Sequence, residues 1–166
     1  MSIAALNEAR ETDAADRFRQ CCTSENGIAG MVADRPYADA QQLGTMADQH
    51  WDKLQEADYL QAFEGHPKIG DVSSLKAKYA NTKELAAGEQ SGVNQANDEI
   101  IEKLAAGNEI YFNKFGFIFI VCATGKSALQ MCDMLYERIP NDRKTEIAIA
   151  SEEQRKIIHI RIEKLL

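Results

Sequence analysis

Apolar residues return every three or four positions along most of this chain, which is the spacing of one face of an α-helix. Between residues 39 and 54, for example, they fall at Leu43, Met46, Ala47, Trp51 and Leu54. The three prolines, at positions 36, 67 and 140, stand where these patterns stop, and proline interrupts helices. We therefore predict an all-α fold, a single-domain helical bundle that spans residues 1–166.

The same spacing, together with capping residues, predicts where the helices begin and end. Helices are expected over residues 13–23, 27–34, 39–54, 59–64, 73–79, 93–115, 128–139 and 145–166, with a loosened turn at Gly107. Gly65 is expected to end the fourth helix in a left-handed conformation, and Ser127 to cap the seventh. Residues 117–123 favour a strand by composition but have no obvious partner strand, so an extended stretch and a helix start both stay open.

Composition excludes several classes of protein. The formal net charge of −7 argues against a general nucleic-acid-binding surface, which needs clustered cations. No apolar run approaches the roughly 20 residues that cross a bilayer, and we expect no signal peptide. The four cysteines include the neighbours Cys21 and Cys22 but no CxxC pair, which favours a reducing compartment such as the cytoplasm.

His66 is the first candidate for chemistry. It stands between Gly65 and Pro67, and proline forces the preceding residue out of the helical conformation. A histidine held on a rigid corner suits proton transfer, because its ordinary pKa is the closest of any side chain to neutrality. A helix–loop–helix corner with an incidental surface histidine explains the same residues.

Arg161 is the second candidate. The helix expected over 145–166 carries one inward face, which consists of Ile147, Ala150, Gln154, Ile157, Ile158, Arg161 and Leu165. A guanidinium on that face needs an anion, because an unpaired buried charge is very costly. The anion could be an internal carboxylate or part of a ligand.

Two glycine-containing stretches give weaker signals. In residues 86–92, small residues surround Glu89 and Gln90, as in a ligand-binding loop or in the first turn of a helix. The stretch Gly125-Lys126-Ser127 imitates the end of a phosphate-binding loop, but the motif needs a glycine where this chain has Ile120. The histidines at 50, 66 and 159 lie far apart and the cysteines do not cluster, so no metal site is expected.

Several of these residues form an ordered set along the chain. The set comprises Phe63, His66, Pro67, Ile69 and Gly70; Glu89 and Gln90; Asn108, Tyr111, Lys114, Phe115, Gly116, Phe117, Phe119 and Ile120; Gly125; Arg138, Ile139, Asn141 and Glu146; and Ile158, Arg161 and Ile162. In order and spacing it resembles the family of 2-oxo-4-hydroxy-4-carboxy-5-ureidoimidazoline (OHCU) decarboxylases. The resemblance extends from near residue 10 to the C-terminus.

The resemblance implies an all-α enzyme, typically a homodimer, that needs neither metal nor organic cofactor. Such an enzyme converts the small molecule OHCU to (S)-allantoin with loss of carbon dioxide during urate breakdown, and it engages neither nucleic acid nor membrane. By position, His66 resembles the family's catalytic proton donor and Glu89 its active-site glutamate. The substrate-binding set that the resemblance implies is Pro67, Ala86, Ala87, Gly88, Glu89, Gln90, Phe119, Ile120, Val121, Cys122, Ala123 and Arg161.

One departure and two alternatives accompany this interpretation. Many family members have serine where this chain has Ala86, so one hydroxyl contact is lost or replaced. The first alternative is a non-catalytic helical interaction domain, in which His66, Glu89 and Arg161 would not converge. The second is a nucleotide-binding enzyme that uses Gly125, Lys126 and Ser127.

Overall fold

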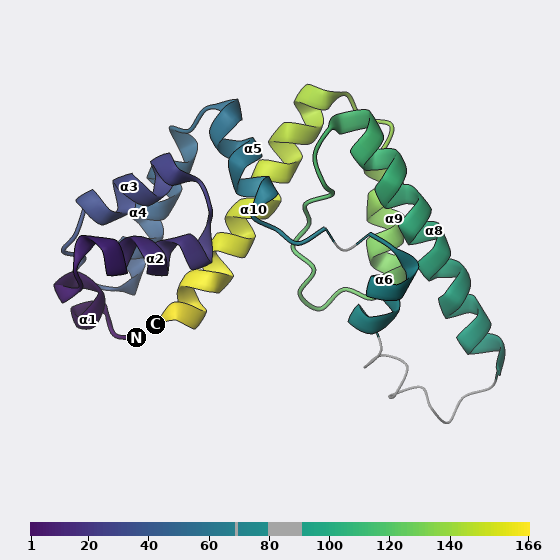
Figure 1. The fold of residues 1–166 in the computed structure, drawn as a ribbon, viewed down its shortest axis with the longest axis horizontal. Coiled ribbons are helices and arrows are strands. Elements are labelled where there is room, and N and C mark those ends of the chain that lie inside the picture. Colours follow the sequence, from purple (N-terminus) through teal and green to yellow (C-terminus); the bar gives the residue numbers. More distant parts are fainter. Residues whose placement is uncertain (69, 80–90) are drawn as a thin grey trace. The chain divides into compact units, whose positions relative to one another are not determined.

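The computed structural model describes residues 1–68, 70–79 and 91–166, and in these ranges the chain forms helices without strands (Figure 1). The predicted all-α class is confirmed. Within the described ranges, no helix combines the length and the apolar character needed to cross a membrane. The helices are α1 (Ile3–Glu8), α2 (Glu11–Cys21), α3 (Glu25–Ala33), α4 (Ala40–Asp52), α5 (Glu56–Glu64), α6 (Val72–Lys78), α8 (Ser91–Phe115), α9 (Ala128–Arg138) and α10 (Arg143–Leu165).

The chain divides into two compact units. Unit 1 comprises residues 1–66, 120–122 and 147–166, and unit 2 comprises residues 67–119 and 123–146. Helices α1 to α5 and most of α10 therefore belong to unit 1, whereas α6, α8 and α9 belong to unit 2. The single domain that we expected over residues 1–166 stays a prediction.

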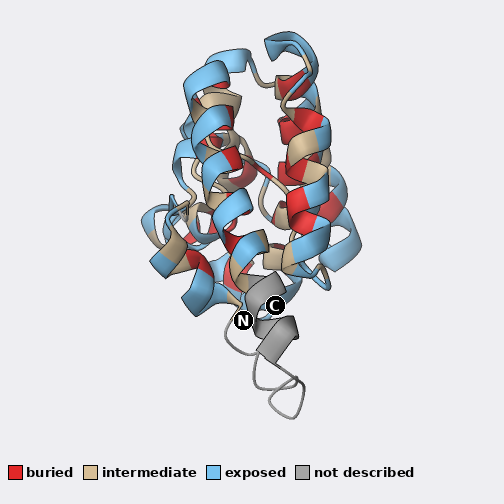
Figure 2. Ribbon diagram, turned by 90° about the vertical axis from the view of Figure 1, so that its right-hand side faces the viewer, coloured by how far each residue is buried: buried red, intermediate tan, exposed pale blue. Residues whose placement is uncertain are grey.

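Unit 1 is built on helices that begin at polar capping residues. Ser24 accepts a hydrogen bond from the Gly27 N–H at 3.4 Å before α3, and Asp39 accepts one from the Gln42 N–H at 2.8 Å before α4. The apolar faces of these helices meet in a core that includes the buried side chains of Phe18 and Leu43. In Figure 2, the coloured helices nearest the viewer carry buried residues on one side and exposed residues on the other.

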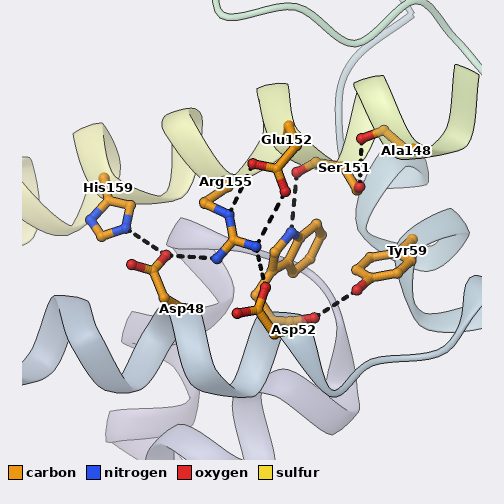
Figure 3. A network of polar contacts seen from close by, with 9 residues as sticks. Asp48, Asp52, Tyr59, Ala148, Ser151, Glu152, Arg155 and His159 are labelled. Carbon is orange, nitrogen blue, oxygen red and sulfur yellow. Dashed lines mark hydrogen bonds and ion pairs between the residues drawn. The ribbon is translucent and has the colours of Figure 1, made fainter. Parts of the chain in front are cut away.

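A polar network joins α4 to α10 within unit 1 (Figure 3). Arg155 of α10 donates hydrogen bonds to Asp48 at 3.0 Å and to Asp52, both on α4. His159 lies one turn further along α10, with its Nε2 atom 2.8 Å from the same Asp48 carboxylate. Trp51, which is buried, donates to the Ser151 carbonyl at 3.1 Å. These contacts fix the position of α10, the helix that carries Arg161.

Unit 2 centres on the long helix α8, which packs against α9 and α6. The loosened turn that we expected at Gly107 is wrong, because α8 continues through this residue without a break. A Cβ atom at Gly107 would lie 2.8 Å from Leu135 Cδ2 of α9, so the glycine serves close helix packing.

Residues 117–123 connect α8 to α9 as an irregular segment that is neither strand nor helix. Phe117, Ile120 and Cys122 are buried, which explains the apolar composition that suggested a strand. Of the two conformations left open by the sequence, the buried extended stretch is the closer description.

The expected left-handed conformation of Gly65 is wrong. Gly65 has φ −69° and ψ −12°, a right-handed conformation open to any residue. Its lack of a side chain matters for another reason, since a Cβ atom there would lie 2.1 Å from Thr23 Oγ1. The glycine thus permits close packing of Thr23 against the end of α5.

Candidate active site

His66 lies on the corner that follows α5. The Thr23 hydroxyl donates to the Gln61 carbonyl at 3.1 Å and so satisfies one of the last carbonyl groups of that helix. The His66 N–H donates to the Phe63 carbonyl at 3.2 Å. The backbone of the histidine is therefore tied to the last turn of α5, and Pro67 follows it directly.

The His66 ring contacts two side chains of α10. Its Nε2 atom lies 2.5 Å from Gln154 Oε1, and its Nδ1 atom lies 3.4 Å from Arg161 Nη2. All three residues belong to unit 1. The structure thus brings together the two side chains, His66 and Arg161, that the sequence singled out on separate grounds.

Arg161 is half-buried, and its Nη1 atom donates to the Cys21 carbonyl at 3.3 Å. In the ranges 1–68, 70–79 and 98–166, where side chains are described, no carboxylate pairs with this guanidinium. The neighbouring thiols do not compensate its charge either, because burial raises the pKa of Cys21 to about 11 and also raises the pKa of Cys22. An internal carboxylate partner, the first of the two anion sources considered, is thus absent from these ranges, and a ligand as the partner stays a prediction.

The pKa of His66 is lowered from its ordinary value of 6.5. Burial is the main cause, the positive charge of Arg161 acts in the same direction, and the contact with Gln154 opposes both. The imidazole is therefore neutral at neutral pH and able to accept a proton.

The other predicted substrate-binding residues fall into three groups. Residues 86–90, which include Glu89, lie outside the described residues, so their place in the site stays a prediction. Pro67 is exposed directly after His66. In the segment 119–123, residues 120–122 belong to unit 1 with His66 and Arg161, whereas Phe119 and Ala123 belong to unit 2.

Phe119 packs into a polar and aromatic cluster of unit 2. The Arg138 guanidinium lies 4.5 Å from the centroid of its ring and pairs with the fully buried Glu146. Glu146 also accepts hydrogen bonds from Tyr111 Oη at 2.6 Å and from Asn141 Nδ2 at 3.2 Å. The motif residues 111, 138, 141 and 146 therefore build the interior of unit 2, a role that the sequence did not reveal.

The stretch Gly125-Lys126-Ser127 forms the turn and cap that open α9. Gly125 adopts a left-handed φ of 74°, and Ser127 Oγ accepts from the Gln130 N–H at 3.2 Å. The predicted capping role of Ser127 is confirmed. Among the described residues, no group of three or more His, Cys, Asp or Glu side chains is placed to hold a metal ion.

Unit 1 also holds a cavity of about 40 Å³. Most of its lining is apolar, including Phe18, Ile28, Met31 and Trp51, and neither His66 nor Arg161 contributes to it. Its lining includes Cys21, whose carbonyl accepts from Arg161, so the cavity adjoins the candidate site without including its two polar side chains.

With this geometry in place, a comparison with known proteins identifies the family. The family model described as OHCU decarboxylase matches residues 7–163. The chain belongs to the OHCU decarboxylase family. The resemblance that the motifs indicated is thereby confirmed.

Two relatives and a solved structure agree with this assignment. The chain is 31% identical over 150 residues to the uric acid degradation bifunctional protein TTL of Arabidopsis thaliana, which covers 90% of this chain and 46% of that protein. It is 24% identical over 138 residues to the 2-oxo-4-hydroxy-4-carboxy-5-ureidoimidazoline decarboxylase of Amia calva, covering 83% of this chain and 78% of that protein. A crystal structure of OHCU decarboxylase in the presence of (S)-allantoin matches with a TM-score of 0.70 and 32% identity, covering 90% and 96% of the two chains. The chain thus spans less than half of the Arabidopsis relative.

The sequence did not single out Gln154 as a functional residue. From the sequence alone, a glutamine on the inward face of α10 does not indicate which side chain it contacts. Its amide can either accept or donate a hydrogen bond, so many partners are compatible with it. Only its position on the same face as Arg161 hinted at the site.

Proposed function

We propose that this chain decarboxylates OHCU and releases (S)-allantoin and carbon dioxide in urate breakdown. The observation that carries the proposal is the contact of a neutral histidine with a half-buried arginine, His66 Nδ1 to Arg161 Nη2 at 3.4 Å, in a member of the OHCU decarboxylase family. The similarity to a structure of OHCU decarboxylase with (S)-allantoin supports the substrate class.

The chemistry of the substrate explains why side chains suffice. Loss of carbon dioxide leaves an electron pair, and the ring carbon–nitrogen double bond beside the carboxylated carbon can receive it. The protein has to orient the carboxylate, stabilise the negative charge that moves into the ring, and place a proton on one face of the product.

The named side chains divide these tasks. His66, neutral at neutral pH, takes the proton of the substrate hydroxyl and delivers a proton to the neighbouring ring carbon. Arg161 binds an anionic oxygen of the substrate. Glu89 is proposed to accept hydrogen bonds from the N–H groups of the ring or the ureido group. The remaining residues of the segments 86–90 and 119–123 are proposed to enclose the substrate.

The assembly and the location implied by the family resemblance are part of the same proposal. We propose a homodimer in the cytoplasm that acts on a small molecule without a cofactor. Light scattering on the purified chain tests the dimer, since a monomer at working concentrations contradicts it.

The direct test generates OHCU from urate with the two upstream activities, urate oxidation and ring hydrolysis, and then adds this protein. Because OHCU also decays spontaneously to racemic allantoin, circular dichroism of the product distinguishes enzymatic from spontaneous turnover. Enrichment of (S)-allantoin supports the proposal, and racemic product at the spontaneous rate refutes it.

A further inference from the structure

We propose that Gln154 is a positioning residue for His66: it holds the ring by Nε2, so that Nδ1 is the nitrogen that exchanges a proton with the substrate. The part of this proposal that concerns the substrate rests on the proposed function. The part that concerns the ring rests on the geometry of unit 1 alone.

The contacts of the two ring nitrogens determine which one carries the hydrogen. An arginine side chain only donates hydrogen bonds, so the Nδ1 atom that faces Arg161 Nη2 at 3.4 Å presents a lone pair. The hydrogen then sits on Nε2 and points at Gln154 Oε1, 2.5 Å away. Turning the Gln154 amide around would place its NH₂ group against Nε2 and push the ring hydrogen onto Nδ1, toward the Arg161 donors. The arrangement with Oε1 toward His66 is the consistent one.

The burial of Gln154 indicates that this side chain does not serve to raise the free energy of unfolding. The side chain is fully buried, and its Nε2 atom has no hydrogen-bond partner among the described residues. A buried amide with unmet hydrogen-bonding capacity costs free energy that an apolar side chain of similar size would not. Its described hydrogen bond goes to the His66 ring, so orienting that ring is the task that explains its presence.

The two ends of the ring also differ in the burial of the side chains that they contact. Nε2 is held at short distance by a fully buried side chain, whereas Nδ1 faces the half-buried Arg161 over a longer distance. An anionic group that binds Arg161 comes directly to Nδ1. In the proposed step, the Nδ1 lone pair takes the substrate hydroxyl proton as carbon dioxide leaves, the resulting imidazolium donates from Nε2 to Gln154, and Nδ1 then releases the proton to the ring carbon. The ring nitrogen that received the electron pair takes its proton from solvent.

Two substitutions separate this role from a structural one. Gln154→Met keeps the volume but removes the acceptor, and Gln154→Glu replaces the neutral acceptor with a carboxylate. Among the charged and titratable groups that the structure describes near the ring, Arg161 faces it from α10, and the Cys21 and Cys22 thiols at the end of α2 lie close to Arg161. A new carboxylate at 154 is therefore expected to dominate the local field at Nε2.

The two Gln154 variants are expected to shift the acid limb of the kcat/KM profile in opposite directions. Gln154→Met lowers kcat/KM for OHCU about tenfold to a hundredfold, as partners that orient a functional histidine commonly do, without lowering the melting temperature. The acid limb of the kcat/KM profile moves to lower pH in Gln154→Met and to higher pH in Gln154→Glu, because a hydrogen-bond acceptor and a negative charge both favour the imidazolium. As a control, Ser151→Ala, one turn earlier on α10, is expected to leave both kcat/KM and the position of the acid limb unchanged.

The ring hydrogen is observed directly by ¹⁵N NMR of the His66 side chain in the protein without substrate. We expect the Nε2–H form in the wild type and a mixture of both forms in Gln154→Met. An Nδ1–H form in the wild type, or a Gln154→Met variant with unchanged kcat/KM and acid limb, overturns the proposal. If the wild type fails to turn over OHCU, the proposed function fails, while the NMR result still decides how Gln154 holds the ring.

Discussion

At the scale of single residues, the candidate site pairs a proton acceptor with a positive charge. Arg161 disfavours protonation of His66, and burial does so more strongly, so both keep the ring neutral in the absence of a ligand. An anionic substrate bound to Arg161 would weaken this repulsion. The site therefore becomes a better proton acceptor when it is occupied.

The shape of the Arg161 side chain is expected to matter as much as its charge. One of its terminal nitrogens donates to the Cys21 carbonyl and the other faces His66, and lysine has only one nitrogen to offer. We expect Arg161→Lys to lower kcat/KM for OHCU about tenfold to a hundredfold, the usual value of a charged hydrogen bond.

Arg155→Lys is the matched control for this prediction, because Arg155 lies on the same helix but pairs with Asp48, Asp52 and Glu152. Steady-state kinetics of both variants give the comparison. Equal kcat/KM values for Arg161→Lys and the wild type would assign Arg161 a structural role.

The lowered pKa of His66 also predicts how stability depends on pH. Below its ordinary value of 6.5, the unfolded chain binds a proton at this residue more readily than the folded chain does. The contribution of His66 is therefore fully present above pH 6.5 and is lost as the pH falls through the lower, folded-state pKa. Urea unfolding of wild type and His66→Gln from pH 7.5 downward should show a smaller loss for the variant, and parallel curves would contradict the shift.

At the scale of elements, two glycines of α3 are expected to respond in opposite directions. A Cβ atom at Gly27 meets Ser24 Cβ at 3.6 Å and Leu54 Cδ1 at 3.7 Å, which are ordinary contacts, and Gly27 lines the apolar cavity. We expect Gly27→Ala to raise the free energy of unfolding by about 0.5–1 kcal/mol, because alanine favours the helix over glycine.

Gly30 lies one turn further along α3, where a Cβ atom would be 2.4 Å from His50 Nδ1. Gly30→Ala must displace the His50 ring and its contact with Asp34, and we expect it to lower the free energy of unfolding by about 1–3 kcal/mol. Chemical denaturation of both variants measures the difference. Two alanine variants of equal stability would show that the packing around α3 is not as described.

Most helices could be predicted from the sequence, because their apolar spacing and caps are local properties. Ser127 caps the start of α9 as expected, since its side chain accepts directly from the first turn of the helix. The short helix α1 was missed, and α6 begins at Val72 rather than at Ser73, because the Asp71 side chain caps it by accepting from the Ser74 N–H. The conformation of Gly65 was missed because its cause, Thr23, lies far away in the sequence.

The candidate site was predictable in part for the same reason. His66 and Arg161 each carried a local signal, a Gly-His-Pro corner and an inward phase on a helix, although 95 residues separate them. Gln154 carried only its position on the inward face, because its significance depends on which ring nitrogen it meets. The roles of Tyr111, Arg138 and Glu146 in the interior of unit 2 likewise depend on contacts between elements.

At the scale of the whole molecule, the chain carries a formal net charge of −7 although the proposed substrate is an anion. The overall field thus opposes binding, and a local cation has to attract the substrate. Arg161, with its charge uncompensated by the carboxylates that the structure describes, fits this requirement. The net negative charge therefore bears on solubility, whereas substrate binding depends on the local position of Arg161.

The central claim, that this member of the OHCU decarboxylase family forms (S)-allantoin through His66, is tested most directly by following product chirality. OHCU generated in place is treated with wild type or with His66→Gln, and circular dichroism records the allantoin that forms. We expect (S)-allantoin from the wild type and a loss of about 100- to 10,000-fold in its rate of formation by a folded His66→Gln, leaving the racemic product of spontaneous decay. Near-normal formation of (S)-allantoin by the folded variant would contradict the role of His66.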